Sequence, residues 1–230
     1  MDFNKRVLLS GLAGIVVAGS VAAAEPLVLE ASKDTFGRSN NRNRNSGAAE
    51  ALFVAPVPYI KTLVAFDLST VTNKILTAEF RFRQHNSMPE RIDLVVAPMV
   101  NTTNNAAWGE GLGNLGTKGQ NSRPGEASYA FSAFNDVPWE SAAGGALANL
   151  SDPGLWKPSV ATLKGLEWKK GRWVSVPIAD VALLEKIRKS KSPVITFGLW
   201  GSAGDGFYSI SSNNTKWPAE LHLELEQAKK

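Results

Sequence analysis

The sequence predicts an all-β protein, a single jelly-roll-like antiparallel β-sandwich with one short helix. Many short segments have strand character, and turns that contain Gly or Pro separate them. These strands do not alternate with helices, as they would in a fold built around a parallel sheet. A long stretch from 101 to 170 is rich in Gly, Asn, Ser and Trp and has little periodicity, which predicts an irregular excursion from the sandwich.

The N-terminus has the three parts of a secretory signal peptide, residues 1–24. Lys5 and Arg6 give a basic start, an apolar segment follows, and Ala22-Ala23-Ala24 has the small-residue spacing of a cleavage site. The apolar segment approaches the length that spans a membrane, so an uncleaved anchor is the alternative. We expect cleavage after Ala24, a secreted, periplasmic or cell-surface location, and no membrane contact afterwards. Residues 25–230 then form one domain.

Eight segments have the apolar runs or the period-two alternation of β-strands. They are 27–32, 61–69, 75–85, 91–99, 172–178, 192–200, 206–212 and 219–226. In the third of them, Phe80 and Phe82 are expected to share one face because side chains alternate along a strand. The side chains expected on the opposite face are Glu79, Arg81, Arg83 and His85.

Two further segments differ from this strand pattern. The segment 179–190 predicts a helix, because Asp180 is a suitable N-cap, Val181 and Leu184 have near-helical spacing, and basic residues fill the last turn. The segment 34–54 has no regular period and crowds arginines among asparagines. It therefore predicts a polar loop between strands.

Composition limits the function classes. The chain has 230 residues, no cysteine and a formal net charge of +4. This length supports one full hydrophobic core, and the absence of cysteine excludes disulfides, thiolate metal sites and a cysteine nucleophile. A small positive charge on an exported protein suits an anionic glycan better than nucleic acid, which it would seldom meet. Solubility alone explains so small a charge about as well.

Several short motifs follow one another in an order typical of a known family. They are Asp34-Thr35-Phe36, Phe66-Asp67-Leu68-Ser69, Ala78-Glu79-Phe80, Trp108-Gly109-Glu110-Gly111, Pro138-Trp139 and Pro218-Ala219-Glu220-Leu221. In this order the chain resembles the DNRLRE-type, or disaggregatase-related, secreted β-sandwich domains. The resemblance implies a jelly-roll-like carbohydrate-binding module, with alginate-type acidic polysaccharide as a known ligand class. It does not identify ligand residues.

The arginines are the first candidates for a glycan site. Arg81 and Arg83 are two residues apart on a predicted strand, about 7 Å, so each could hold a sugar carboxylate with its planar fork. The arginines of the polar loop could do the same while neighbouring asparagines bind hydroxyls. If the strand forms a floor and the loop a wall, one anionic chain spans both. The alternative for both sets is a solvated surface. The predicted carbohydrate-binding residues are Arg38, Arg42, Arg44, Arg81, Arg83, His85 and Trp108.

The tryptophans are the second set of candidates for a glycan site, because carbohydrate sites stack sugars on exposed aromatic faces. The chain has seven tryptophans. Trp108 lies in the long excursion and is taken as a candidate, although burial beneath the excursion is the alternative for Trp108 and Trp139. Trp173 and Trp200 lie in strands and are expected in the core, and Trp217 fits either place.

No catalytic residue is predicted. Carboxylate pairs occur, but glycoside hydrolysis needs two carboxylates that face each other across a cleft, which spacing does not show. The segment 79–83, Glu-Phe-Arg-Phe-Arg, is superficially similar to the Arg-x-Glu-x-Arg strand of jelly-roll alginate lyases, but its order differs. A polysaccharide lyase is therefore the least favoured alternative. No cofactor is required, and Glu30 with Asp34 could supply oxygen ligands to a structural calcium ion.

The sequence thus predicts an exported, non-catalytic protein that binds an acidic polysaccharide, such as alginate or another uronate polymer. A structural or surface-assembly protein that uses the same sandwich as a scaffold is the alternative, since no enzyme is attached to the single predicted domain. No nucleic-acid partner is expected, and the sequence does not predict the oligomeric state.

Overall fold

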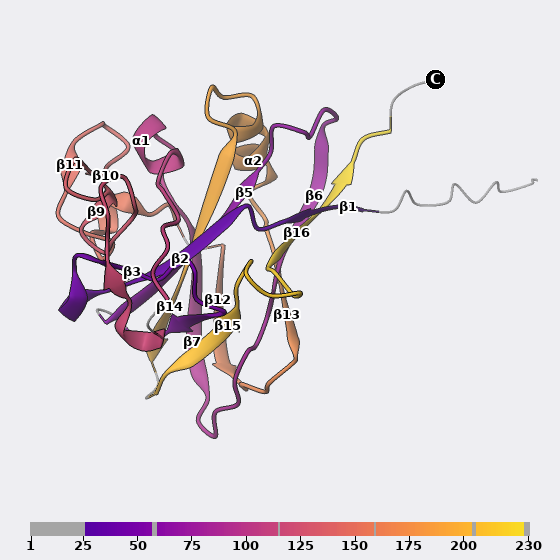
Figure 1. Cartoon of the computed structure of the whole chain (residues 1–230). Helices are drawn as coiled ribbons and strands as arrows, with labels where there is room; N and C mark the ends of the chain where they lie inside the picture. Colours follow the sequence, from indigo (N-terminus) through magenta and orange to yellow (C-terminus); the bar gives the residue numbers. More distant parts are fainter. Residues whose placement is uncertain (1–25, 57–58, 115, 159, 204–205, 228–230) are drawn as a thin grey trace, which may run out of the picture.

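The computed structural model describes residues 26–227, except 57–58, 115, 159 and 204–205. The predicted signal peptide, residues 1–24, lies outside the described residues. The predicted all-β antiparallel sandwich is confirmed, because two large antiparallel sheets face each other across a core (Figure 1). Neither α-helix in the described part of the chain is long and apolar enough to cross a membrane.

Two sheets form the sandwich. The four-stranded sheet has the order β1 (Leu27–Glu30), β16 (Glu220–Leu225), β6 (Ile75–Arg83) and β13 (Trp173–Pro177). The five-stranded sheet has the order β12 (Ala161–Leu166), β7 (Ile92–Pro98), β14 (Val194–Ala203), β5 (Ile60–Asp67) and β2 (Lys33–Arg38). A two-stranded sheet, β4 (Ala51–Val54) with β15 (Tyr208–Ser211), adds to the sandwich at one end.

Phenylalanine side chains fill the space between the sheets. Phe80 of β6 is fully buried, and its ring centroid lies 5.1 Å from that of Phe197 on β14 and 5.8 Å from that of Phe66 on β5. The predicted alternation of β6 is confirmed, since Phe80 and Phe82 are buried and the alternating Glu79, Arg81 and Arg83 are half-buried on the outer face. Aromatic rings at these distances hold the two sheets together.

The excursion as far as η3 (Pro153–Leu155) forms a third layer over the other face of the five-stranded sheet (Figure 1, left). The last part of the predicted excursion is not irregular, because residues 161–166 form β12 of the five-stranded sheet. The third layer contains more regular structure than its sequence suggests. The elements of this layer are α1 (Thr103–Ala106), η2 (Gly116–Lys118), β8 (Gln120–Asn121), β9 (Phe131–Ala133), β10 (Val137–Glu140), β11 (Ala146–Leu147) and η3 (Pro153–Leu155). Trp108 and Trp139 pack against Leu63 and Ala65 of β5, so the alternative of burial beneath the excursion is correct for both.

One glycine permits this layer to approach the sheet. A Cβ atom on Gly198 of β14 would lie 2.3 Å from the ring of Trp156, a distance that real side chains do not adopt. Trp156 also donates its indole N–H to the carbonyl of Leu150 at 2.9 Å. The absence of a side chain at Gly198 therefore lets the Trp156 ring approach the backbone of the sheet closely.

The prediction of a loop over 34–54 is wrong for much of this segment. Its first residues belong to β2, which pairs with β5, and η1 (Ser39–Asn41), β3 (Arg44–Asn45) and β4 follow. The reason is a long-range contact. Hydrogen bonds with β5 satisfy the backbone N–H and C=O groups of β2, so this segment forms a strand whatever its local composition. Asn45 is buried, and its amide donates to the carbonyls of Glu110 (2.6 Å) and Ala127 (2.8 Å).

The predicted helix is confirmed as α2 (Val181–Arg188). The Asp180 side chain accepts from the backbone N–H of Leu183 at 3.0 Å, which is the expected N-cap. Glu185 then joins the helix to the sandwich. Its carboxylate accepts from the backbone N–H of Ile75 at 2.8 Å and from Arg188 at 2.9 Å.

We expect Glu185 to make the fold sensitive to acid. The hydrogen bond from Arg188, and then that from Ile75, lowers the pKa of Glu185 from 4.5 to about 2. The unfolded chain therefore binds more protons between these two values, and this stabilisation is complete above pH 4.5 and is lost as the pH falls toward 2. Glu185→Gln should lower the free energy of unfolding at pH 7, and the difference from wild type should shrink between pH 4.5 and 2 in urea titrations. A difference that is independent of pH would contradict this role.

Candidate functional site

The structure separates the two sets of predicted arginines. Arg81 and Arg83 lie on the outer face of the four-stranded sheet, opposite to the buried Phe80. Arg42 and Arg44 lie near β3, beside the third layer on the far side of the five-stranded sheet (Figure 1). The two sheets of the sandwich stand between the sets, so one glycan groove with a strand floor and a loop wall is not formed.

The loop arginines tie segments of the chain together. Arg42 donates to the carbonyl of Ala148 at 3.1 Å, and Arg44 donates to the carbonyl of Lys118 at 3.2 Å. Arg42 also borders an open hollow of about 440 Å³. Arg38 ends β2, and its guanidinium lies 5.8 Å from the ring centroid of Phe207.

Arg81 and Arg83 belong to a surface that we call the basic–aromatic face, made of Arg81, Arg83, Trp173, Lys216 and Trp217. The guanidinium of Arg81 lies 5.3 Å from the ring centroid of Trp173, and that of Arg83 lies 3.7 Å from Trp217. The ammonium of Lys216 lies 4.3 Å from the same Trp217 ring. Cations at these distances are attracted to the negative faces of aromatic rings.

The expectation that Trp173 belongs to the core is wrong. Trp173 opposes Arg83 in the β6–β13 ladder and is only half-buried. Val174 and Val176 of the same strand point into the core, so the alternation of β13 turns Trp173 to the outer face. Trp200 is likewise half-buried, on the other face of the five-stranded sheet, where it packs against Trp156.

The positive charge of this face is partly neutralised. The Nη1 atom of Arg81 lies 3.8 Å from the Glu220 carboxylate and 3.3 Å from Nε2 of His222, which itself lies 2.6 Å from Glu220. For Arg83 and Lys216, no carboxylate of the described residues lies within ion-pair distance. The charges of these two side chains are therefore available to an anion.

His85 lies two residues after the end of β6, close enough to Arg83 for their charges to interact. Its backbone N–H donates to the carbonyl of Ser209 at 2.8 Å. Burial first, and then the positive charge of Lys170, lowers the pKa of His85, while Glu50 acts in the opposite direction. A neutral imidazole is therefore favoured near pH 7, and it can form hydrogen bonds with sugar hydroxyls without adding charge.

Burial corrects two further predictions, the one for Trp108 and the one for the pair Glu30 and Asp34. Trp108 is only 1% exposed, and its indole N–H donates to the hydroxyl of Thr196 at 3.0 Å, so it presents no surface for sugar stacking. Glu30 is exposed on β1, whereas Asp34 is fully buried on β2. The structure does not bring Glu30 and Asp34 together as metal ligands. Within the described ranges, no group of three or more His, Cys, Asp or Glu side chains is placed to hold a metal ion.

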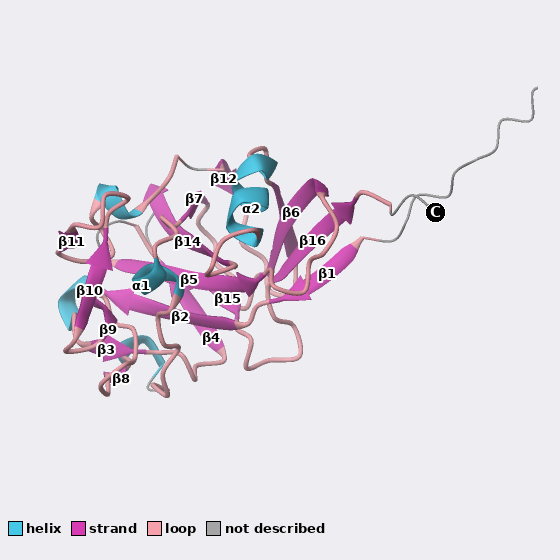
Figure 2. Cartoon of the chain, turned by 90° about the horizontal axis from the view of Figure 1, so that it is seen from above, coloured by secondary structure: helices cyan, strands magenta, loops and turns pink. Residues whose placement is uncertain are grey.

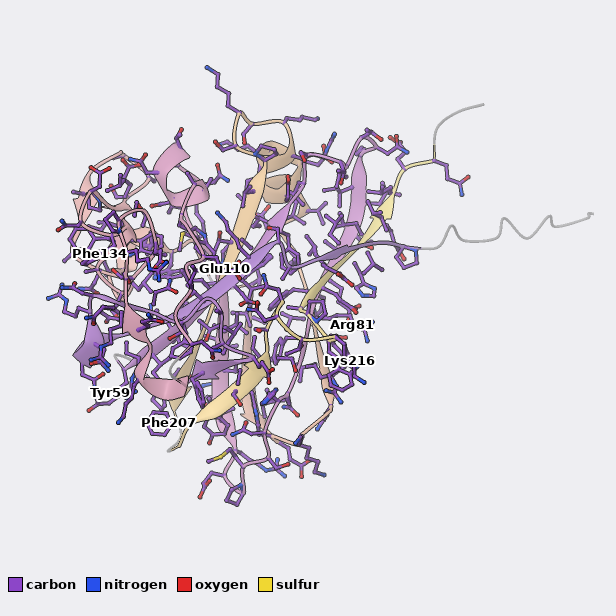
Figure 3. The ribbon with its side chains drawn as sticks, viewed as in Figure 1. Tyr59, Arg81, Glu110, Phe134, Phe207 and Lys216 are labelled. Atoms are coloured by element: carbon purple, nitrogen blue, oxygen red, sulfur yellow. The ribbon has the colours of Figure 1, made fainter. Side chains whose placement is uncertain are left out.

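Some site residues were not identified from the sequence. The sequence pattern does not single out Lys216 and fits two places for Trp217, although a Lys-Trp-Pro sequence just before the last strand is a usable signal. Tyr59 and Phe207 are exposed aromatic side chains in a different part of the molecule from Arg81 and Lys216 (Figure 3). Exposed aromatic residues on loops have no periodic pattern, so a single sequence does not reveal them.

No protein-family model matches the chain, and no curated protein matches it. The resemblance to DNRLRE-type domains therefore stays a prediction.

Proposed function

We propose that this protein is an exported, non-catalytic β-sandwich that binds an acidic polysaccharide, such as alginate or another uronate polymer, on its basic–aromatic face. The observation that carries the proposal is the placement of Arg83 and Lys216 on the partly exposed Trp217 ring, where no carboxylate of the described residues neutralises them. The signal-like N-terminal sequence supports export, and the motif order supports a carbohydrate-binding role.

The chemistry of a uronate polymer fits this surface. Each sugar ring combines an apolar C–H surface with a carboxylate, and the face combines indole rings with guanidinium groups. The planar guanidinium of Arg83 stacks on Trp217, so less side-chain freedom is lost when its N–H fork binds a carboxylate. Arg81 is held in the same way over Trp173.

Binding should be selective for charge. In affinity electrophoresis we expect alginate and pectate to retard the protein more than a neutral glucan, because only the acidic polymers offer partners to the arginines. The retardation should weaken as salt rises, since charges on an exposed surface are screened over about 10 Å at 0.1 M ionic strength.

Equal mobility in all gels would contradict glycan binding. Size-exclusion chromatography at several protein concentrations supplies the complementary result. A chain that assembles with concentration and binds none of the glycans would support the scaffold alternative, whereas a monomer retarded by alginate supports the proposal.

A further inference from the structure

The carboxylate of Asp34 has an unusual environment. The residue is 0% exposed, and its Oδ2 atom accepts from the backbone N–H of Asn213 at 2.6 Å. Its other oxygen, Oδ1, is buried and has no hydrogen-bond partner in the described part of the chain. A buried carboxylate oxygen without a partner is costly, so this atom points to a ligand that supplies one.

A second carboxylate lies beside it. Oε1 of Glu110 accepts from the backbone N–H of Asp34 at 3.0 Å. Burial above all, with the charge of Glu110 added, raises the pKa of Asp34 well above its usual range, against the hydrogen bond from Asn213. Two acidic groups therefore lie close together in one place in the fold. Asp34 is buried there, and Glu110 is half-buried.

Backbone segments distant in the sequence close this place. Gly47 approaches so closely that a Cβ atom on it would lie 2.1 Å from the carbonyl oxygen of Glu110. The carbonyl of Gly47 in turn accepts from the side-chain amide of Asn214 at 2.7 Å. Strand β2, the turn at Gly47, the segment at Glu110 and the loop at 213–214 thus meet around the Asp34 carboxylate.

Burial lowers the pKa of Lys33, and the charge of Glu110 raises it by less, so Lys33 interacts with Glu110, but the Lys33 ammonium is held by other partners. Lys33 donates from its ammonium to the carbonyls of Ala106 (2.8 Å) and Trp108 (2.6 Å), and its Nζ atom lies 4.5 Å from the Trp108 ring centroid. Among the described residues, no ion pair joins a cation to Asp34 or Glu110.

We propose that Asp34 and Glu110 are the anionic ligands of a structural calcium ion. Calcium prefers oxygen ligands, accepts irregular coordination, and takes carbonyl and water oxygens in addition to carboxylates. No cysteine is present in the chain, so thiolate ligands for a softer metal are excluded. Glu110 replaces Glu30 as the partner of Asp34.

Such an ion would connect the core to the binding surface. The loop that begins at Asn213 continues to Lys216 and Trp217, so calcium at Asp34 would fix the loop that carries two of the five residues of the basic–aromatic face. The calcium site itself does not depend on glycan binding, because its ligands lie in the fold and not on that surface.

Thermal unfolding after EDTA treatment, followed by titration with CaCl₂, tests the site. At free calcium about 100 times the Kd, we expect Tm to rise by roughly 5–10 °C, and calorimetry should show one ion per chain. Asp34→Asn and Glu110→Gln should each remove this rise. Glu167→Gln, which changes an exposed carboxylate paired with Lys169, should keep it.

Several results would overturn the assignment. They are a wild-type Tm that does not respond to calcium, an equal response to magnesium, or a calcium response that persists in Glu110→Gln. If Asp34→Asn does not fold, the wild-type titration and Glu110→Gln still decide. If Asp34→Asn stabilises the EDTA-treated protein and calcium has no effect on wild type, Asp34 is a buried carboxylic acid and the proposal fails.

Discussion

Replacing Phe80 with alanine should lower the free energy of unfolding by about 3–5 kcal/mol, the cost of removing a buried phenylalanine and leaving a cavity. Phe80 is fully buried, and its ring contacts Phe66 and Phe197 of the five-stranded sheet from β6 of the four-stranded sheet. The cavity would therefore open between the two sheets. The hydrogen-bonded strands of each sheet would hold their positions and leave the cavity unfilled. Urea unfolding at pH 7 measures the loss.

Phe207→Ala is the matched control. The same atoms are removed from a side chain that is 48% exposed, so the change should stay within about 0.5 kcal/mol. Equal losses at both positions, or a loss below about 1 kcal/mol at Phe80, would contradict the role of this aromatic cluster in holding the two sheets together.

Lys61→Met should have a large effect in the opposite direction and stabilise the protein. Lys61 is 3% exposed, and its ammonium lies 3.9 Å from the Trp200 ring centroid and 4.8 Å from that of Trp156. Burial lowers the pKa of Lys61 from 10.5 to about 8. Keeping Lys61 protonated at pH 7 therefore lowers the free energy of unfolding by up to about 3 kcal/mol, and the attraction between the ammonium and the two indole rings offsets part of this loss.

The pH dependence of this effect has a definite sign. Between pH 8 and 10.5 the unfolded chain binds more protons at Lys61 than the folded protein does, so wild-type stability should rise with pH across this window. Methionine keeps an apolar stem against the indoles and removes the charge, so the advantage of Lys61→Met should be largest at pH 7 and disappear near pH 10.5.

Burial also lowers the pKa of Lys33 to about 8, but Lys33 is present in both proteins, so its contribution cancels in the difference. Urea titrations of both proteins at pH 7, 9 and 10.5 measure that difference. A less stable Lys61→Met at pH 7 would show that the indole contacts outweigh the cost of burying the charge.

Local patterns predicted the local parts of this fold. The alternation of β6 placed Phe80 and Arg81 on opposite faces, because side-chain direction in a strand depends only on position along it. The N-cap at Asp180 and the spacing of the following apolar residues predicted α2 for the same reason. Strand β2 was missed, because its pairing with β5, and not its own composition, makes it a strand.

The candidate site was harder to predict because it depends on contacts between distant segments. Arg83 was recognised from its strand, but Trp217 reaches it from a loop before the last strand. Arg42 was grouped with Arg83 by charge alone, and only the topology shows that two sheets separate them (Figure 2). For the same reason the sequence does not reveal Glu110, whose carboxylate accepts a hydrogen bond from the backbone N–H of Asp34 on β2.

The most direct test of glycan binding on the basic–aromatic face is calorimetric titration of a uronate oligosaccharide into wild type, Arg83→Ala and Arg42→Ala. Arg83→Ala should weaken binding by roughly 10- to 150-fold, the loss of a charge-assisted hydrogen bond, and should flatten the salt dependence. Arg42→Ala removes an equal charge on the far side of the sandwich and should leave the affinity unchanged. An unchanged affinity in Arg83→Ala, or a loss confined to Arg42→Ala, would contradict the proposed face.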